Sequence, residues 1–164
     1  MGATFKDAKG RDWTLAITIG DRDDVVRACD LDLYGVLNNN AQSLLRLFGN
    51  LPALGKVLFV LLADQAKEKQ ISPEDFAKGL SGPVLAKAKE AFQAALIDFF
   101  LSEPEKAEAI RQILAAQAEV TAEAIKAAKV RLTEMTAAEV AKVRFKIQET
   151  PLSELSGLAP DDLG

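Results

Sequence analysis

The sequence predicts a mainly α-helical protein with an N-terminal β-hairpin, a compact helical body and a long alanine-rich C-terminal helical arm. Apolar and polar residues alternate over 12–19, which is the period of a half-buried strand. Apolar residues then recur at steps of three and four over 41–101, which is the period of a helix. Beyond residue 102 the composition shifts to alanine, glutamate and lysine, which favour helix but supply little apolar surface.

These patterns divide the chain into three segments. Residues 1–101 hold the hairpin and the helical body, and residues 102–149 form the helical arm. Residues 150–164 combine leucine, glycine and proline with net negative charge, so we expect a flexible acidic tail or a short docking peptide.

The hairpin is expected from strands at 3–7 and 12–19, joined by a turn at 8–11 that contains Gly10. An isolated hairpin is only marginally stable in water, so its apolar face needs a partner, either the helical body or another protein. Trp13 is therefore a candidate core residue and a candidate partner-binding aromatic. The apolar face of the second strand would carry Trp13, Leu15, Ile17 and Ile19.

Helix signals follow the hairpin. Three aspartates at 21–24 suit the first turn of a helix over 21–29, because carboxylates complement the helix dipole. Residues 31–40 contain a glycine and three consecutive asparagines, which predict a loop. Helix resumes near Ala41 and ends at Gly49-Asn50.

The most apolar helix candidate is 52–69, which is hydrophobic on every side and therefore central. Ser72-Pro73 marks the start of a short helix, with an N-cap residue followed by proline at the first helical position. An amphipathic helix over 83–101 is expected to pack on the central one. Most of the large apolar surface belongs to Leu58, Leu61, Phe92, Leu96 and Phe99.

The arm carries one narrow apolar stripe, which is a seam for one neighbouring helix. So narrow a face gains little burial from its own domain, so we expect the arm to bind a partner or to self-associate. The covering helix is either residues 137–148, if the chain breaks near 134–136, or a helix of another chain packed on a continuous rod. The stripe consists of Leu114, Ala118, Thr121, Ile125, Ala128, Leu132 and Met135.

Composition argues against catalysis. The chain has no histidine, a single cysteine and a net charge of −4, which disfavours a histidine base, a disulfide and nucleic-acid binding. The sequence 30–35 imitates the start of a calcium loop, but Tyr34 and Ala41 stand where oxygen ligands are needed. Cys29 suits a small core residue. We therefore expect no enzyme activity, no cofactor, and no catalytic, cofactor-binding or metal site.

A cytoplasmic protein without a membrane anchor is expected. The longest strictly apolar run, 57–63, is far shorter than the roughly 20 residues that span a bilayer. The first residues lack the apolar core of a signal peptide.

Four segments, in this order and spacing, resemble a known family. They are Trp13–Gly20, Asp30–Leu33, Leu62–Ala66 followed by Ile71–Phe76 and Leu80, and Ala91–Phe100. The family consists of small proteins encoded in phage-type tail gene clusters of planctomycete-like bacteria, and the resemblance covers about residues 4–101. It implies a tail assembly chaperone, which coats the helical tape measure protein until the tube protein polymerises round it, or another tail-associated protein. It implies no site residues.

We therefore expect a non-enzymatic, phage-type tail assembly chaperone that binds the tape measure or tail tube protein, and a homo-oligomer. The alternatives are a structural component of a tail or contractile injection particle, or a self-associating helical scaffold. A strand edge open to a neighbour's sheet implies incorporation into a tube or ring, whereas a hairpin folded onto 52–69 and 83–101 implies a free chaperone. The candidate partner-binding residues are Trp13, Leu114, Ile125, Leu132 and Met135.

Overall fold

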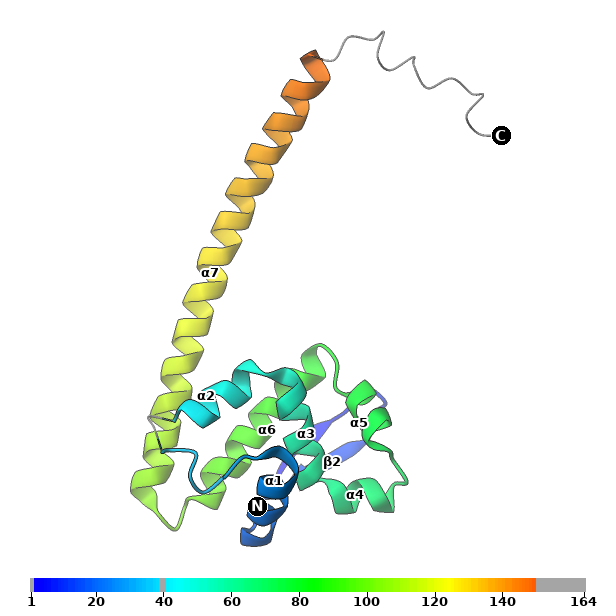
Figure 1. The fold of residues 1–164 in the computed structure, drawn as a ribbon, viewed down its shortest axis with the longest axis vertical. Helices are drawn as coiled ribbons and strands as arrows, with labels where there is room; N and C mark the ends of the chain where they lie inside the picture. The colour runs from blue at the N-terminus through cyan, green and yellow to red at the C-terminus, as the bar shows by residue number, and fades with distance from the viewer. Residues whose placement is uncertain (1, 39–40, 150–164) are drawn as a thin grey trace, which may run out of the picture. The chain divides into compact units, whose positions relative to one another are not determined.

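The computed structural model describes residues 2–38 and 41–149, with side chains up to residue 144. It confirms a mainly α-helical protein with an N-terminal antiparallel hairpin and a long C-terminal helix (Figure 1). The expected acidic tail at 150–164 lies outside the described residues. The elements are β1 (Ala3–Lys6), β2 (Asp12–Leu15), α1 (Ile19–Cys29), α2 (Gln42–Gly49), α3 (Leu51–Leu61), α4 (Ala63–Glu68), α5 (Pro73–Gly79), α6 (Pro83–Phe99) and α7 (Pro104–Glu149).

The hairpin forms at the expected turn. Phe5 pairs with Trp13 in the antiparallel register, and Gly10 has a φ of 78°, which a residue with a side chain adopts only with strain. The strand β2 is shorter than predicted because it ends at Leu15. Ile19 is 80% exposed and begins α1, so the prediction that it belongs to the apolar strand face is wrong.

A capping box explains why the strand gives way to helix. The Thr18 hydroxyl accepts a hydrogen bond from the Asp21 backbone N–H at 3.4 Å, and the Asp21 carboxylate accepts one from the Thr18 backbone N–H at 2.6 Å. These two bonds satisfy polar groups that a helix start otherwise leaves unpaired. The helix α1 therefore begins two residues before the aspartate cluster that predicted it.

The predicted central helix at 52–69 is two helices. The helix α3 ends at Leu61, and α4 begins at Ala63, although no proline or glycine stands at the break. Leu62 is buried and its backbone N–H donates to Leu58 O at 3.0 Å and Phe59 O at 3.2 Å. By contrast, the start of α5 is confirmed, because the Ser72 hydroxyl accepts from the Asp75 N–H at 3.1 Å.

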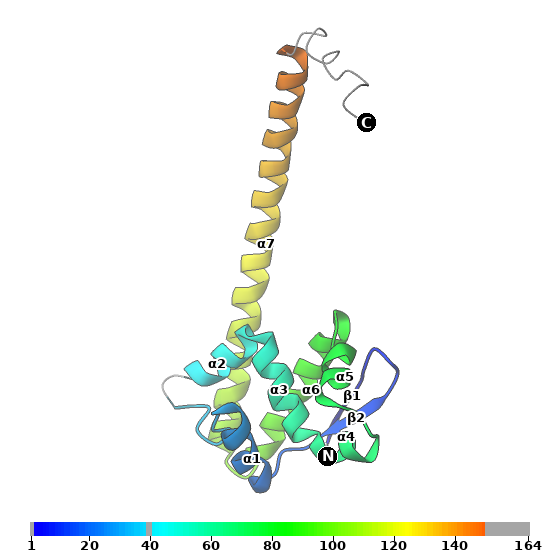
Figure 2. The same ribbon diagram turned by 45° about the vertical axis from the view of Figure 1, so that its right-hand side comes forward.

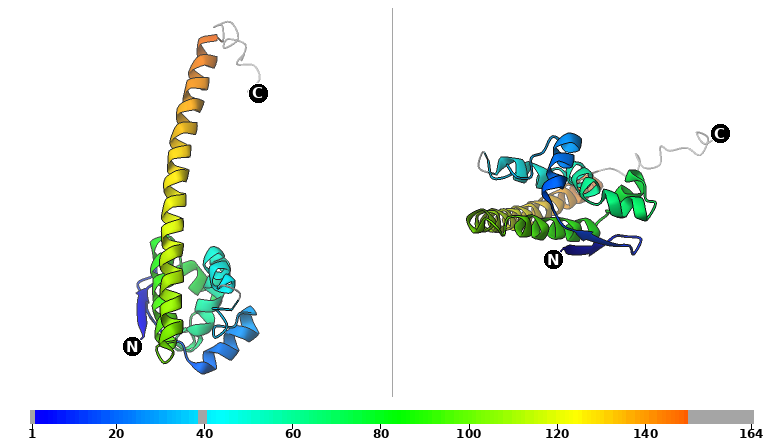
Figure 3. Two further views of the ribbon diagram at one scale, coloured as in Figure 1. Left: turned by 90° about the vertical axis from the view of Figure 1, so that its left-hand side faces the viewer. Right: turned by 90° about the horizontal axis from the view of Figure 1, so that it is seen from below.

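The core of the body gathers apolar side chains from the hairpin and from each of the described helices, α1 to α7. The main neighbour of α6 is β1, and the main neighbour of α3 is α1, so the hairpin takes much of the place expected for the central helix on α6. Figure 3 shows the hairpin lying along α6 when the protein is seen from below. The largest fully buried side chains are Trp13, Phe76, Phe92, Phe100, Leu15, Leu33, Leu44, Leu54, Leu58, Leu62, Leu96 and Ile110.

Asp7 is the buried charged residue of the described core, and it organises the hairpin turn. Its carboxylate accepts hydrogen bonds from Trp13 Nε1 at 2.9 Å, from Arg11 Nε at 2.6 Å and from the backbone N–H groups of Lys9 and Arg11. A Cβ on Gly79 would lie 3.3 Å from Asp7 Oδ2 and 3.2 Å from Arg11 Nη2. The absence of a side chain at Gly79 thus lets α5 approach the buried ion pair.

The helix α7 is continuous from Pro104 to Glu149, as Figure 2 shows. Its first turns belong to the body, where Ala107 and Ile110 are buried. Contacts divide the chain into a body that ends at Gln117 and a second unit that begins at Ala118, so the body reaches further than residue 101. Because the helix does not break near 134–136, residues 137–148 do not fold back on the stripe.

Candidate functional site

An exposed apolar stripe on α7 is the strongest candidate for a binding surface. Ile125 is 50% exposed, Leu132 65% and Met135 60%. Val140 and Val143 continue the stripe on the same helix and are also about half exposed. Both valines belong to the segment 137–148, one of the two candidates for the covering helix, but the continuous helix makes them part of the stripe. The side chain of Ile147, in the same segment, lies outside the described residues.

Two threonines beside Leu132 have their hydroxyl groups bonded to the backbone of α7. The Thr136 hydroxyl donates to Leu132 O at 2.7 Å, and the Thr133 hydroxyl donates to Lys129 O at 2.9 Å. Each hydroxyl is therefore satisfied by its own helix, and the threonine methyl group is left for contact with a partner. Leu132, both threonines, Ala137 and Val140 line a shallow hollow on this helix.

Trp13 is not available to a partner, so its prediction as a partner-binding residue is wrong for the folded protein. Its side chain is fully buried, and its ring packs edge-on against Phe76 at 5.0 Å between centroids. Its indole N–H is already bonded to Asp7. The alternative weighed from the sequence, a core residue on the inner face of the hairpin, is what the structure supports.

Leu114 shares the spacing of the stripe but not its exposure. It is half-buried and packs against the core of the body, together with Ile113. Ile110 lies one turn earlier and is fully buried. The exposed part of the predicted stripe therefore lies beyond residue 117, and Leu114 serves the body.

A side chain that sequence reasoning missed closes the outer edge of β2. The Gln65 side chain accepts a hydrogen bond from the Thr14 N–H at 3.1 Å and donates one to Thr14 O at 2.7 Å. These are the backbone groups that an added strand would use. Gln65 lies on α4, fifty-one residues away in the sequence, and no local pattern marks it.

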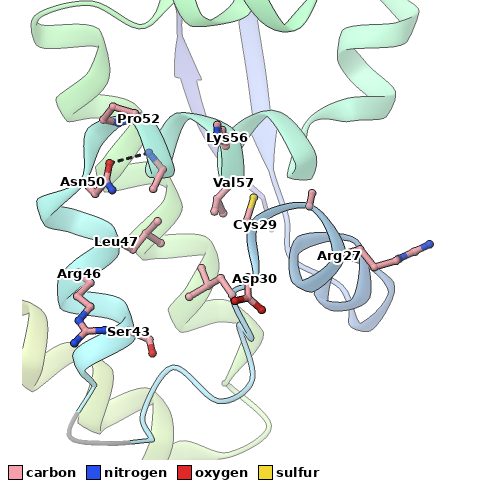
Figure 4. Close-up of a pocket in the computed structure, with 13 residues that line it drawn as sticks. Arg27, Cys29, Asp30, Ser43, Arg46, Leu47, Asn50, Pro52, Lys56 and Val57 are labelled. Atoms are coloured by element: carbon pink, nitrogen blue, oxygen red, sulfur yellow. Dashed lines mark hydrogen bonds between the residues drawn. The ribbon is translucent and has the colours of Figure 1, made fainter.

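A groove of about 650 Å³ lies between the end of α1, α2 and the start of α3 (Figure 4). Arg46 and Lys56 lie on its walls, and within the described residues neither forms an ion pair. The Asn50 side chain accepts from the Ala53 N–H at 3.2 Å and so caps α3 rather than facing a ligand. The remaining lining residues are Arg27, Ala28, Cys29, Asp30, Leu31, Ser43, Leu47, Pro52 and Val57.

Cys29 lines this groove and is only partly buried, and it packs against the core as the small core residue expected from the sequence. Burial nevertheless raises the pKa of its thiol, and the positive charge of Lys56 offsets this only in part. A reactive cysteine needs a lowered pKa. The raised pKa disfavours the thiolate, which is the nucleophilic form.

A second hollow, of about 570 Å³, lies where the start of α1 meets the end of α6. The Tyr34 hydroxyl donates to Glu103 at 3.0 Å and accepts from Lys106 at 3.1 Å. The Lys106 ammonium lowers the pKa of Glu103 by its hydrogen bond, with a further contribution from Tyr34. Ile19 and Phe99 supply apolar surface beside this cluster. The Tyr34 hydroxyl, the Glu103 carboxylate and the Lys106 ammonium are therefore bonded to one another.

Asp24, Asp30 and Asp32 have structural roles near α1. Asp32 accepts two hydrogen bonds from the Arg22 guanidinium, at 2.7 and 3.0 Å, which lower its pKa to about 2. Asp30 ends α1 in the left-handed conformation, and Asp24 pairs with Arg27. In the described residues no three carboxylate or cysteine side chains come together as metal ligands do.

The expectation that the protein needs no metal is directly testable. Because Asp32 is paired with Arg22 and Asp21 caps α1, titration calorimetry with calcium, magnesium and zinc should detect no micromolar binding. A stoichiometric site that is lost in Asp30→Asn or Asp23→Asn would contradict this prediction.

Comparison of the chain with known protein families, with curated proteins and with solved structures gives no match. Among the described residues no single helix is long and apolar enough to span a membrane, and α2 with α3 meets the length and composition only as a pair bent by 102°.

Proposed function

We propose that this protein is a non-enzymatic, phage-type tail assembly chaperone that binds the tape measure or tail tube protein during assembly. The observation that carries the proposal is the exposed stripe of Ile125, Leu132, Met135, Val140 and Val143 on α7. A chaperone of a long helical protein needs a surface that grips helices. A narrow apolar stripe on a long helix suits that task, because such a stripe is completed by one neighbouring helix.

The closed hairpin supports a free chaperone over a structural component of a tail or contractile injection particle. Gln65 occupies the backbone groups of Thr14 at the outer edge of β2. The apolar face of the hairpin packs within the body, with Phe5, Trp13 and Leu15 buried. A subunit that joined a tube by adding a strand at β2 would first have to displace Gln65.

The double variant Ile125→Glu/Leu132→Glu should abolish binding of the tape measure or tail tube protein while the body stays folded. Both side chains are at least half exposed in the isolated chain, so glutamate there costs little folding stability. Buried against a partner helix, the same carboxylates would be unpaired and costly. Co-purification from cells that co-express the candidate partner measures binding, and thermal melting measures folding.

A matched control is available on the same helix. Val120→Glu/Val130→Glu adds the same charge at valines that are 67% and 52% exposed but lie off the stripe. We expect this variant to bind the partner as the parent protein does. Loss of a homo-oligomer in the first variant alone would instead favour a self-associating scaffold, and unchanged mass and binding in both would refute the gripping role of α7.

A further inference from the structure

The charges beside the stripe on α7 are mostly basic. Lys126 follows Ile125, Arg131 precedes Leu132, and Lys142 and Arg144 stand on either side of Val143. A residue one position from a stripe residue lies about 100° round the helix from it, which is the edge of the stripe. Four basic side chains therefore line the edges.

The acidic side chains of residues 118–144 are fewer on and beside the stripe than the basic ones. Glu123 stands two positions from Ile125, which places it on the opposite face of the helix, whereas Glu134 directly precedes Met135 and lies near an edge of the stripe. Glu119 lies beside the beginning of the stripe and Glu139 lies within it. Together with Lys129, which also lies within the stripe, the apolar face carries more basic than acidic charge.

Among the side chains of this unit that the structure describes, the basic edges form no ion pair. Over residues 118–144 the structure places no carboxylate within ion-pair distance of a lysine or arginine. The ion pairs on the described part of α7 lie near its start, at Glu103–Lys106 and Glu108–Arg111. The charges beside the stripe are thus available to a partner.

We propose that the occupant of the stripe is a helix of a different protein, with its own apolar stripe bordered by glutamate or aspartate. This inference rests on the proposed function and names the chemistry of its partner. Charges at the edges of a helix pair decide which partner is chosen, because opposite charges attract there and like charges repel.

A second copy of this chain fits the stripe less well. Lys126 and Arg144 lie on one edge, and Arg131 and Lys142 lie on the other. Parallel helices bring opposite edges together and antiparallel helices bring equal edges together, so either arrangement sets basic side chains against basic side chains. An anionic membrane also fits less well, because α7 carries a single aromatic residue, Phe145, to enter the interface.

Two synthetic helical peptides of the length of 118–144 test the proposal against the full chain. Both carry isoleucine and leucine at steps of three and four, and they differ only at the positions beside that stripe, with glutamate in one and lysine in the other. We expect the glutamate peptide to bind about tenfold more tightly, the effect of four exposed ion pairs. Its affinity should fall as salt is raised.

The variant Lys126→Glu/Arg131→Glu should reverse this preference. Its matched control is Lys67→Glu/Lys87→Glu, which makes the same change in net charge at two exposed lysines of the body and should leave the preference unchanged. If the preference reversed in both variants, the net charge of the protein and not the charge beside the stripe would set the preference, and the proposal would be overturned.

The outcomes separate this inference from the proposed function. Equal binding of both peptides, lost in Ile125→Glu/Leu132→Glu, would overturn the acidic partner but keep a helix-gripping α7. Binding of neither peptide, with tape measure binding unaffected by that double variant, would refute both. Binding to phosphatidylserine vesicles that depends on Lys126 and Arg131, without discrimination between the peptides, would assign the surface to a membrane and overturn the proposal.

Discussion

Phe92→Ala should lower the free energy of unfolding by about 3–5 kcal/mol, as expected when a buried aromatic ring is replaced by a methyl group. Phe92 is fully buried on α6, and its ring packs edge-on against Phe48 of α2 at 6.0 Å between centroids. The truncation removes this contact and leaves a cavity where the hairpin, α2 and α6 supply the core. Urea unfolding followed by circular dichroism measures the loss.

A control for this variant lies on the same element. Phe99→Ala removes an equally large ring from the end of α6, but Phe99 is only partly buried. We expect it to cost clearly less than Phe92→Ala, since less apolar surface leaves water at that position. Equal losses at the two positions would show that the packing at Phe92 is not what stabilises the body.

Asp7→Ala should cost about 3 kcal/mol, which is large for the removal of one carboxylate. Buried donors that lose their acceptor keep the full penalty of desolvation, and here the Trp13 N–H and the Arg11 guanidinium both lose theirs. Asp12→Ala is the matched control, because its carboxylate is 79% exposed and its pairing with Lys6, at 3.5 Å, is a surface contact. It should change stability by no more than about 0.5 kcal/mol.

The stability that Asp7 provides should depend on pH. Burial raises the pKa of its carboxyl, but the hydrogen bonds from Trp13 and Arg11 outweigh burial and hold the pKa below its ordinary value of 3.8. A lowered pKa in the folded state means that the contribution is complete above pH 3.8 and is lost as the pH falls through the folded value.

The difference in melting temperature between the parent and Asp7→Ala should therefore be constant near neutral pH and shrink below pH 3.8. The Arg22–Asp32 pair also responds to acid, but both proteins contain it, so its effect cancels in the difference. A difference that grew on acidification would show that Asp7 is protonated in the folded protein.

The candidate surface was only partly predictable. The steps of three and four from Leu114 to Met135 marked one face of a helix, and that face exists. The same spacing could not tell that Leu114 contacts the body while Ile125 and Leu132 are exposed. Exposure depends on which other elements reach a face, and that information lies in residues distant in sequence.

Features that depend on a few neighbouring residues were predictable from the sequence. Gly10 marked the hairpin turn, Ser72 and Pro73 marked the start of α5, and the alanine-rich composition marked α7 as helix. The capping box of Thr18 and Asp21 was equally local, and its spacing could have placed the start of α1 correctly. Turns and caps are set by dihedral preferences and hydrogen bonds within one turn of chain, so short patterns carry them.

Three features depend on contacts between distant elements: the burial of Asp7 beside Trp13, the closure of the β2 edge by Gln65, and the break of the central helix at Leu62. Gln65 reaches Thr14 across fifty-one residues, and Gly79 leaves room for Asp7 and Arg11 from α5. The first two features require a hydrogen bond between a polar side chain and a group on another element. The third requires a buried apolar residue to pack against another element. The local helix or strand propensity of a segment does not depend on these distant contacts, so the sequence pattern alone could not reveal the three features.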